Sequence, residues 1–373
     1  MPLYVRELGV TDPGRIALWS GLLAAVTPAV SGVLGPFFGR LADRFGRKLM
    51  LIRSLAAFTL IIAVMGLVRT VEELFVARFV QGLFAGFTPM AMAVASVSAP
   101  KDRVPGALAL VQSAQLASVA IGPAVGGYVA DHFGIRYAFF ATAALCAVAL
   151  VGLIWLFQEM APAGAGGGRV VPPRLPMRQA LGYPNFVLVL GLLFVAQFLD
   201  RGLALLIPLQ VAHLPGIERV AAASGAIISV AAVAATLSAN VAARLSRGLP
   251  AAKLVMLGLL VGGPLCAALA LARGWPSLLV VRTLVALCLG GVITLTYALG
   301  AEIVPAEHRG AAFGWLALGV QIGTAASPLV SGGVASVSLA GAYVVDGALA
   351  CLAGALVAFC WRPPRPGSRA AAP

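Results

Sequence analysis

A few charged side chains inside otherwise apolar stretches are the residues of this sequence best suited to chemistry. Asp200 and Arg201 lie within "FVAQFLDRGLALLIP" (residues 194–208), and Asp346 lies in the last long apolar stretch. Burying a charge among apolar groups is costly, so such residues usually face a cavity and serve a function. A carboxyl group held away from water can load and release a proton near neutral pH. Asp200 is therefore the first candidate for a proton carrier, and Asp346 is the second.

A purely structural role is the alternative for the same residues. Successive residues on a helix point about 100° apart, so Asp200 and Arg201 are not expected to face the same way, and each could pair with another helix. Uncharged polar residues in the apolar stretches could contact a substrate, or could equally bond between helices. They are Gln112, Gln115, Gln197 and Gln321.

The composition indicates which elements must position these side chains. Hydrophobic residues make up 61% of the 373 residues and the mean hydropathy is +0.99, whereas soluble domains are about 45–50% apolar. Apolar stretches of about 20 residues recur, each long enough to cross a bilayer as a helix. Barrel strands would alternate apolar and polar residues, and these stretches are apolar on all faces. The sequence therefore predicts an all-α integral membrane protein that crosses the membrane many times.

Eleven spans are expected. They cover roughly residues 16–38, 49–68, 74–97, 105–130, 137–157, 184–211, 221–243, 252–272, 276–300, 310–334 and 339–361. The segment 158–182 contains "APAGAGGGRVVPPRLP", whose glycines and prolines favour a flexible tether. We expect a first helical bundle over 1–157, a cytoplasmic linker over 158–182, a second bundle over 183–361 and a cytoplasmic tail over 362–373.

The distribution of positive charge predicts the orientation. The net charge is +13, but the basic residues lie in short loops between apolar stretches and form no basic face, which argues against nucleic-acid binding. If residues 39–48 face the cytoplasm, 17 of the 26 Lys and Arg residues lie on that side and six on the other. This bias is the one that cytoplasmic loops show.

An internal repeat divides the chain into two parallel halves of about 205 residues. "PLYVREL" (2–8) resembles "PLQVAHL" (208–214), and "LFVARFV" (74–80) resembles "LLVVRTL" (278–284), which aligns Arg78 with Arg282. Further matches are Gln115 with Gln321 and Gly126-Gly127 with Gly332-Gly333. Duplicated bundles are typical of secondary transporters.

The repeat also leaves residues 184–207 without a counterpart after Met1, so the first half has five expected spans and the second has six. We expect that a first helix of about 25 residues is missing, most simply because the start is placed too late. A protein with eleven spans and an outward N-terminus is the alternative.

The segment "GRLADRFGRK" (39–48) resembles the signature loop of the major facilitator superfamily. A plain positive anchor would explain its Arg and Lys residues but neither Asp43 nor the two glycines. The resemblance implies a gate that closes the cytoplasmic side. Its residues would be Gly39, Asp43, Arg44, Gly46, Arg47 and Lys48. The second half has "ARLSRGLPAAK" (243–253), with Arg247 where the first has Asp43, so we expect an asymmetric gate.

Two further segments resemble motifs of the same superfamily. "LFVARFVQGLFAG" (74–86) resembles its fourth-helix motif, which implies a role in proton coupling for Arg78 and a place near the substrate for Gln81; alternatively, Arg78 snorkels to the headgroups. "SVAIGPAVGG" (118–127) resembles the fifth-helix motif of the antiporter branch. The residues that match this motif are Gly122, Pro123, Gly126 and Gly127. These residues would also form a packing face with a proline kink, and the two interpretations are compatible.

Taken as a whole, the chain resembles the drug–proton antiporters of the multidrug and tetracycline efflux branch. The resemblance implies a monomer in a bacterial inner membrane that exports small amphipathic or cationic compounds by alternating access. Protons and the substrate would be its partners besides lipid, no cofactor beyond the proton gradient would be needed, and Arg201 would line the cavity with the glutamines. Export of a sugar, amino acid or other metabolite is one alternative, and a transport-inactive fragment is another. No enzyme is expected, because His132, His213 and His308 lie in or near loops without catalytic partners.

Overall fold

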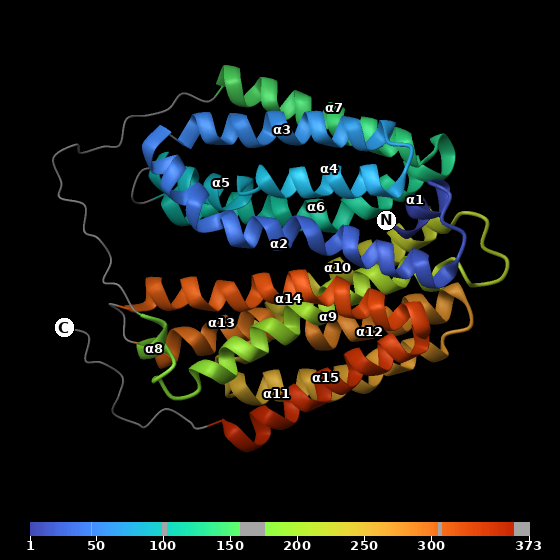
Figure 1. Cartoon of the computed structure of the whole chain (residues 1–373). Helices are drawn as coiled ribbons and strands as arrows, with labels where there is room; N and C mark the ends of the chain where they lie inside the picture. The colour runs from blue at the N-terminus through green and yellow to red at the C-terminus, as the bar shows by residue number, and fades with distance from the viewer. Residues whose placement is uncertain (46, 99–102, 157–175, 305–307, 362–373) are drawn as a thin grey trace. The chain divides into compact units, whose positions relative to one another are not determined.

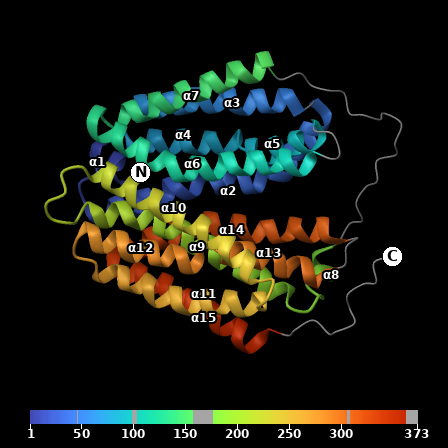
Figure 2. The same ribbon diagram turned by 180° about the vertical axis from the view of Figure 1, so that it is seen from behind.

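The computed structural model describes residues 1–45, 47–98, 103–156, 176–304 and 308–361, except for the side chains of residues 35–47, 88, 89, 93, 96–98, 104, 105 and 309–311. Helices make up the secondary structure of these residues (Figures 1 and 2). The chain divides into two compact units. Unit 1 comprises Met1–Gly168 and Gly216–Ser229, and unit 2 comprises Arg169–Pro215 and Val230–Pro373. The all-α membrane fold predicted from composition is confirmed.

Unit 1 is built from seven helices and the first turns of an eighth. They are α1 (Pro2–Glu7), α2 (Pro13–Phe45), α3 (Arg47–Leu67), α4 (Val71–Leu83), α5 (Phe87–Ser98), α6 (Val104–Phe133), α7 (Ile135–Leu156) and the start of α10 (Val220–Leu245). Thr70 is the N-cap of α4, and its side chain accepts a hydrogen bond from the Glu73 amide at 3.2 Å, as N-cap threonines do. In both ribbon views α3 lies along α7 (Figures 1 and 2).

Unit 2 is organised around one buried helix. Its elements are α8 (Met177–Ala180), α9 (Phe186–Val211), the rest of α10, α11 (Ala251–Ala268), a 3-10 turn η1 (Leu269–Leu271), α12 (Trp275–Leu289), α13 (Val292–Ile303), α14 (Arg309–Val337) and α15 (Leu339–Cys360). Helix α9 packs against α13, α14 and α15, and 61% of its membrane-length stretch is buried. It therefore forms the core of this unit.

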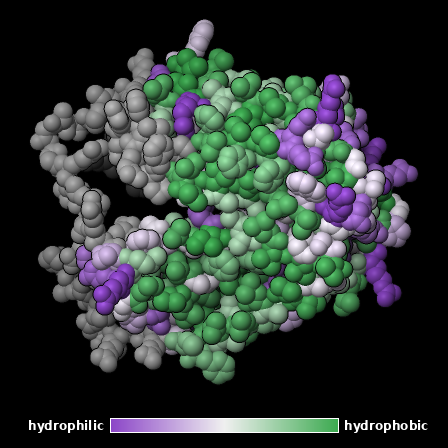
Figure 3. All heavy atoms as spheres, viewed as in Figure 1, coloured by the Kyte–Doolittle hydropathy of each residue, from purple (hydrophilic) through white to green (hydrophobic). Residues whose placement is uncertain are grey.

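Ten helices among the described residues are long and apolar enough to cross a membrane. They match ten of the eleven expected spans to within a few residues, and the one that differs is 74–97. There α4 and α5 are separate helices of 13 and 12 residues, joined through Phe84–Gly86. Gly86 has a φ of +108°, which a continuing right-handed helix does not allow. In the view of Figure 3, hydrophobic residues cover the middle of the helices of either unit.

One hydrogen bond occurs at equivalent positions of the two sequence repeats. The Tyr4 hydroxyl donates to the Met65 carbonyl at 2.7 Å, and the Gln210 side chain donates to the Leu269 carbonyl at 2.7 Å. Tyr4 and Gln210 occupy the same place in "PLYVREL" and "PLQVAHL". Each donor bonds a carbonyl near the end of α3 or of the 3-10 extension of α11, and the Leu269 carbonyl also accepts from the Ala272 amide at 3.2 Å. The two halves keep this bond with different side chains.

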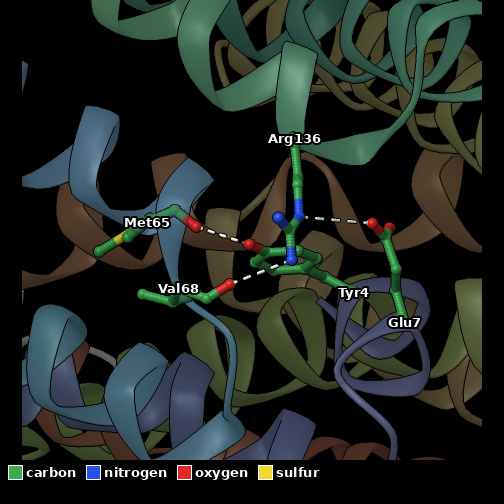
Figure 4. A network of polar contacts seen from close by, with 5 residues as sticks. All are labelled: Tyr4, Glu7, Met65, Val68 and Arg136. Atoms are coloured by element: carbon green, nitrogen blue, oxygen red, sulfur yellow. Dashed lines mark hydrogen bonds and ion pairs between the residues drawn. The ribbon is translucent and has the colours of Figure 1, made fainter.

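In unit 1 the contact belongs to a small network shown in Figure 4. Arg136, at the start of α7, donates to the Val68 carbonyl at 3.3 Å, and its Nε lies 3.7 Å from a Glu7 carboxylate oxygen. The Tyr4 ring packs on Phe139, with the centroids 5.0 Å apart. Burial raises the pKa of the Tyr4 hydroxyl, which keeps it protonated as a donor. The network thereby joins α1 to the ends of α3 and α7.

A second contact recurs in both units, with side chains of different sizes. Gly82 of α4 packs on Thr27 and Val30 of α2, so closely that an added Cβ would lie 2.7 Å from the Val30 Cβ. The positions 204 residues later (286 − 82 = 204) form an all-alanine cluster in unit 2. Its members are Ala231, Ala234 and Ala286. Unit 1 therefore has a glycine packed on a valine where unit 2 has alanines at the equivalent positions of the repeat.

The units differ most in how α6 and α14 are covered. A stripe of small residues on α14, four apart, is buried against α9: Gly319, Gly323, Ser327 and Ser331. The positions 206 residues earlier (319 − 113 = 206) on α6 are all exposed: Ser113, Ala117, Ile121 and Val125. In one apolar stretch of 18 residues per helix, 28% of the α14 residues are buried and none of the α6 residues is. Among the described residues, the face that α9 covers in unit 2 is open in unit 1.

The contact at Gly82 gives a test of the packing. We expect Gly82→Ala to lower the free energy of unfolding by about 1–3 kcal/mol, because overpacking forces the two helices apart. Adding Val30→Ala should recover part of the loss, since it removes the Val30 methyl that lies 3.0 Å from the new Cβ. Thermal unfolding of the purified protein in detergent measures both effects. Gly106→Ala is the control, because no atom lies within 4 Å of its added Cβ; an unchanged Gly82→Ala would contradict the packing argument.

Candidate proton-coupling, gating and packing sites

The expected gating loop lies largely outside the described side chains. Helix α2 ends at Phe45 and α3 begins at Arg47. Gly46 and the side chains of the other predicted gating residues fall outside the described part of the chain: Gly39, Asp43, Arg44 and Arg47. Lys48 is described, and its Nζ lies 3.4 Å from the Ile154 carbonyl near the end of α7. The gate itself stays a prediction.

Arg78 is held inside unit 1 by uncharged partners. Its guanidinium donates to the Gln81 side-chain oxygen at 3.2 Å, and its carbonyl accepts from the Thr27 hydroxyl at 2.8 Å. The Nε atom is buried without a hydrogen-bond partner among the described residues. The Arg78–Gln81 pair at one helical turn brings together two of the residues that the sequence singled out. Arg78 thus retains unused hydrogen-bonding capacity within the bundle.

Asp200 and Arg201 interact with each other. Both side chains are about half exposed, at 55% and 52%, and the Arg201 Nε lies 3.9 Å from an Asp200 carboxylate oxygen. We expected the two side chains to diverge, as their Cα–Cβ directions do on a helix. The long, flexible arginine side chain overcomes that divergence. Of the candidate acids, Asp200 is the accessible one.

Asp346 has the opposite environment. Its side chain is buried, at 1% exposure, and both carboxylate oxygens lack a hydrogen-bond partner among the described residues. Arg282 of α12 and Tyr343, one turn earlier on α15, are buried in the same unit. Both Arg282 and Asp346 act electrostatically on Tyr343, which places the three in one neighbourhood. Arg282 was not chosen as a site residue from the sequence, although its match to Arg78 in the repeat could have indicated it.

The candidate substrate-contacting residues are spread over both units. Gln81, Gln112 and Gln115 belong to unit 1, whereas Gln197, Arg201 and Gln321 belong to unit 2. Gln81 and Gln197 are buried, Gln115 is half-buried, and Gln112 and Gln321 are exposed. Among the described residues, no hydrogen bond joins one of these glutamines to another. Their role in substrate binding therefore stays a prediction.

The antiporter-type motif of α6 packs against the first turns of α10, within unit 1. A Cβ added to Gly127 would overlap the Ala221 carbonyl, and one added to Gly225 would overlap the Pro123 carbonyl. By contrast, Gly122 and Gly126 have no neighbouring atom within 4 Å of an added Cβ. Close approach is therefore required at Gly127 and at Pro123, and not at the other two glycines of the motif.

Two polar contacts strengthen this joint. The Asp131 carboxylate accepts hydrogen bonds from the amides of Ala221 and Ala222, at 3.2 and 2.6 Å. These amides belong to the first turn of α10, where free N–H groups and the positive end of the helix dipole favour an anion. The amide of Ala124, next to Pro123, donates to the Ser229 hydroxyl at 3.1 Å. Asp131 was not singled out in the sequence, because a cap supplied by a distant helix has no local signal.

The difference between the motif glycines can be tested directly. We expect Gly127→Ala to weaken the α6–α10 joint by about 1–3 kcal/mol through overlap with a backbone carbonyl that cannot move alone. Gly126→Ala should leave it unchanged. The rate of disulfide cross-linking between cysteines introduced on the facing ends of α6 and α10 measures the closeness of the two helices. Equal effects of the two substitutions would contradict a specific requirement at Gly127.

Comparison with known proteins gives this arrangement its context. A family model described as the Major Facilitator Superfamily matches residues 1–273 and also residues 223–373, so the two matches span the whole chain. The Multidrug resistance protein MdtG of Klebsiella pneumoniae is 29% identical over 345 residues, which are 90% of this chain and 82% of the relative. MdtG of Escherichia fergusonii is 35% identical over 247 residues, 64% of this chain and 59% of the relative. The chain thus matches less than two thirds of the length of the second relative.

The fold also resembles that of solved transporters. The crystal structure of a bacterial homolog to the human lysosomal transporter Spinster, in an inward-facing and occupied conformation, aligns with a TM-score of 0.73 and 19% identity. The alignment covers 97% of this chain and 93% of that one. The same homolog in an unoccupied conformation aligns with a TM-score of 0.72. With the duplicated helices, the motif joint and the family match taken together, the chain belongs to the Major Facilitator Superfamily.

Proposed function

We propose that this protein exports small amphipathic or cationic compounds across a membrane in exchange for protons. The observation that carries the proposal is the similarity to multidrug resistance proteins, which extends over 90% of the chain in the Klebsiella pneumoniae relative. Ionisable side chains inside apolar helices support the proton-coupled mechanism, since such residues are costly in a membrane unless they serve transport. Inward movement of protons would supply the energy, and no other cofactor is required.

Three positions take part in the proposed cycle. Asp200, the accessible carboxylate, exchanges a proton for a cationic substrate, with Arg201 as its counter-charge. Arg78, which keeps a buried and unpartnered Nε, tunes the coupling from unit 1. The loop at residues 39–48 closes one side through Asp43, Arg44 and Arg47. Rocking of two bundles then exposes the substrate site alternately to either side of the membrane.

We further propose that the protein acts as a monomer in the inner membrane of a bacterium, with residues 39–48 and the C-terminal tail in the cytoplasm. The positive charge supports this orientation, because 17 Lys and Arg residues would lie on the cytoplasmic side and six on the other. The hydrophobic residues that cover the middle of the helices in Figure 3 suit contact with lipid.

Inside-out vesicles test this function with a fluorescent cationic dye. Dye accumulation should follow an imposed proton gradient and stop when a protonophore removes the gradient. We expect Asp200→Asn to reduce accumulation to the level of vesicles without the protein, because the amide cannot exchange a proton. Glu218→Gln, which removes an exposed carboxylate near the start of α10, is the matched control and should transport like the parent.

Three results would count against the proposal. Transport by the parent that ignores the proton gradient would contradict proton coupling. Asp200→Asn vesicles that accumulate dye as fast as the parent would show that Asp200 is not the proton carrier. A parent that carries metabolites but no dye would favour the metabolite-exporter alternative.

A further inference from the structure

Asp346 is a buried acidic residue, 1% exposed, that the proposed exchange at Asp200 does not use. It lies on α15, packed against α9, α11 and α14. Its two carboxylate oxygens are buried and have no hydrogen-bond partner among the described residues. An ionised carboxylate in such a place would be an isolated charge, and proteins avoid that state by neutralising the group.

The groups around Asp346 do not supply a matching charge. From α9 it faces Gly202, where an added Cβ would lie 3.0 Å from an Asp346 oxygen. From α14 it faces hydroxyl groups, since the same Cβ position lies 2.8 Å from the Ser331 Oγ and 3.1 Å from the Ser327 Oγ. The three oxygens therefore converge on the surface of α9 at a residue without a side chain. Ser327 already donates to the Phe198 carbonyl.

The remaining neighbours are titratable but do not form an ion pair with it. Arg282 is buried on α12, with its Nε unpartnered, and no nitrogen of Arg282 lies within the 4.0 Å of an ion pair with Asp346. Cys266 of α11 and Tyr343 of α15 interact electrostatically with both Asp346 and Arg282, and Cys288 and Cys351 act on Cys266. The Tyr343 hydroxyl is also buried without a partner. Arg282 thus shares the neighbours Tyr343 and Cys266 with Asp346 but forms no ion pair with it.

We propose that Asp346 is a second proton-binding site, occupied in the conformation seen here and separate from Asp200. The proton makes the carboxyl neutral, which allows α9, α14 and α15 to close around it. When that proton leaves, the new charge needs either water or Arg282, and neither is in contact while α9 stays where it is. Loss of the proton therefore favours movement of α9 away from α14 and α15.

Helix α9 links the two acidic sites. Gly202, which contacts the Asp346 oxygens, is two residues from Asp200. The exposed side of this turn of α9 thus carries Asp200, and its buried side faces Asp346 of α15. A shift of α9 on deprotonation of Asp346 moves Asp200 and Arg201 with it, which couples an internal proton to the accessible one. This coupling rests on the proposed function, whereas the protonation of Asp346 does not.

Infrared spectroscopy tests the protonation without reference to transport. In the purified parent protein at pH 7, a protonated carboxylic acid gives a carbonyl stretching band that shifts to lower frequency in D2O. We expect Asp346→Asn to remove this band, and Asp200→Asn and Glu218→Gln to leave it in place. A parent spectrum without such a band, or a band that survives Asp346→Asn, would overturn the proposal.

A second variant covers the case in which Asp346→Asn does not fold. Ser331→Ala removes a hydroxyl close to the carboxyl group, so it should shift the frequency of the band without abolishing it. An unshifted band would place the protonated carboxyl elsewhere and overturn the proposal. Ser113→Ala, which removes an exposed hydroxyl on α6, is the matched control.

The vesicle assay then separates this proposal from the proposed function. If the parent moves dye with the proton gradient, Asp346→Asn should still exchange dye down its own concentration gradient but lose gradient-driven accumulation. Retained accumulation would overturn the coupling role of Asp346. If the parent moves no dye at all, the proposed function fails, while the infrared result on Asp346 still decides whether the site is protonated.

Discussion

The constraint on which this structure depends is the absence of water from the bilayer interior. Backbone groups must be satisfied within the chain, so each apolar stretch becomes a helix. Side chains face the same demand. An ionised carboxylate that is buried without a partner loses its hydration and gains no compensating contact. A proton removes that charge, which is why burial without a counter-charge favours a neutral Asp346.

The same constraint explains why duplicated contacts persist while their residues change. Tyr4 and Gln210 both satisfy a carbonyl at the end of a helix, one through a hydroxyl and the other through an amide. Either donor is acceptable, because the carbonyl requires only a hydrogen bond. The packing at Gly82 and at Ala286 likewise recurs at equivalent positions with different residue types. What the two halves share is a set of physical requirements at equivalent positions.

The elements of the fold were largely predictable, because apolar length and turn residues are local properties of the chain. The interruption between α4 and α5 was not predicted, since "GLFAG" is apolar enough to continue a span and only the φ of Gly86 shows the break. Of the site, the pairing of Arg78 with Gln81 follows from helical spacing. The neighbourhood of Arg282, Tyr343 and Asp346 combines side chains of α12 and α15, and no local pattern in the sequence indicates that combination. The Asp131 cap is equally non-local.

The open face of α6 has a consequence for helix spacing. On α14 the stripe against α9 consists of glycine and serine, which let the two backbones approach until Gly323 meets the Phe194 carbonyl. On α6 the equivalent positions nearer its C-terminal end hold Ile121 and Val125, whose branched side chains stand where Ser327 and Ser331 stand on α14. The distance between packed helix axes grows with the size of the side chains at the contact. Any helix laid on this face of α6 would therefore diverge from α6 toward that end, where α9 and α14 stay close.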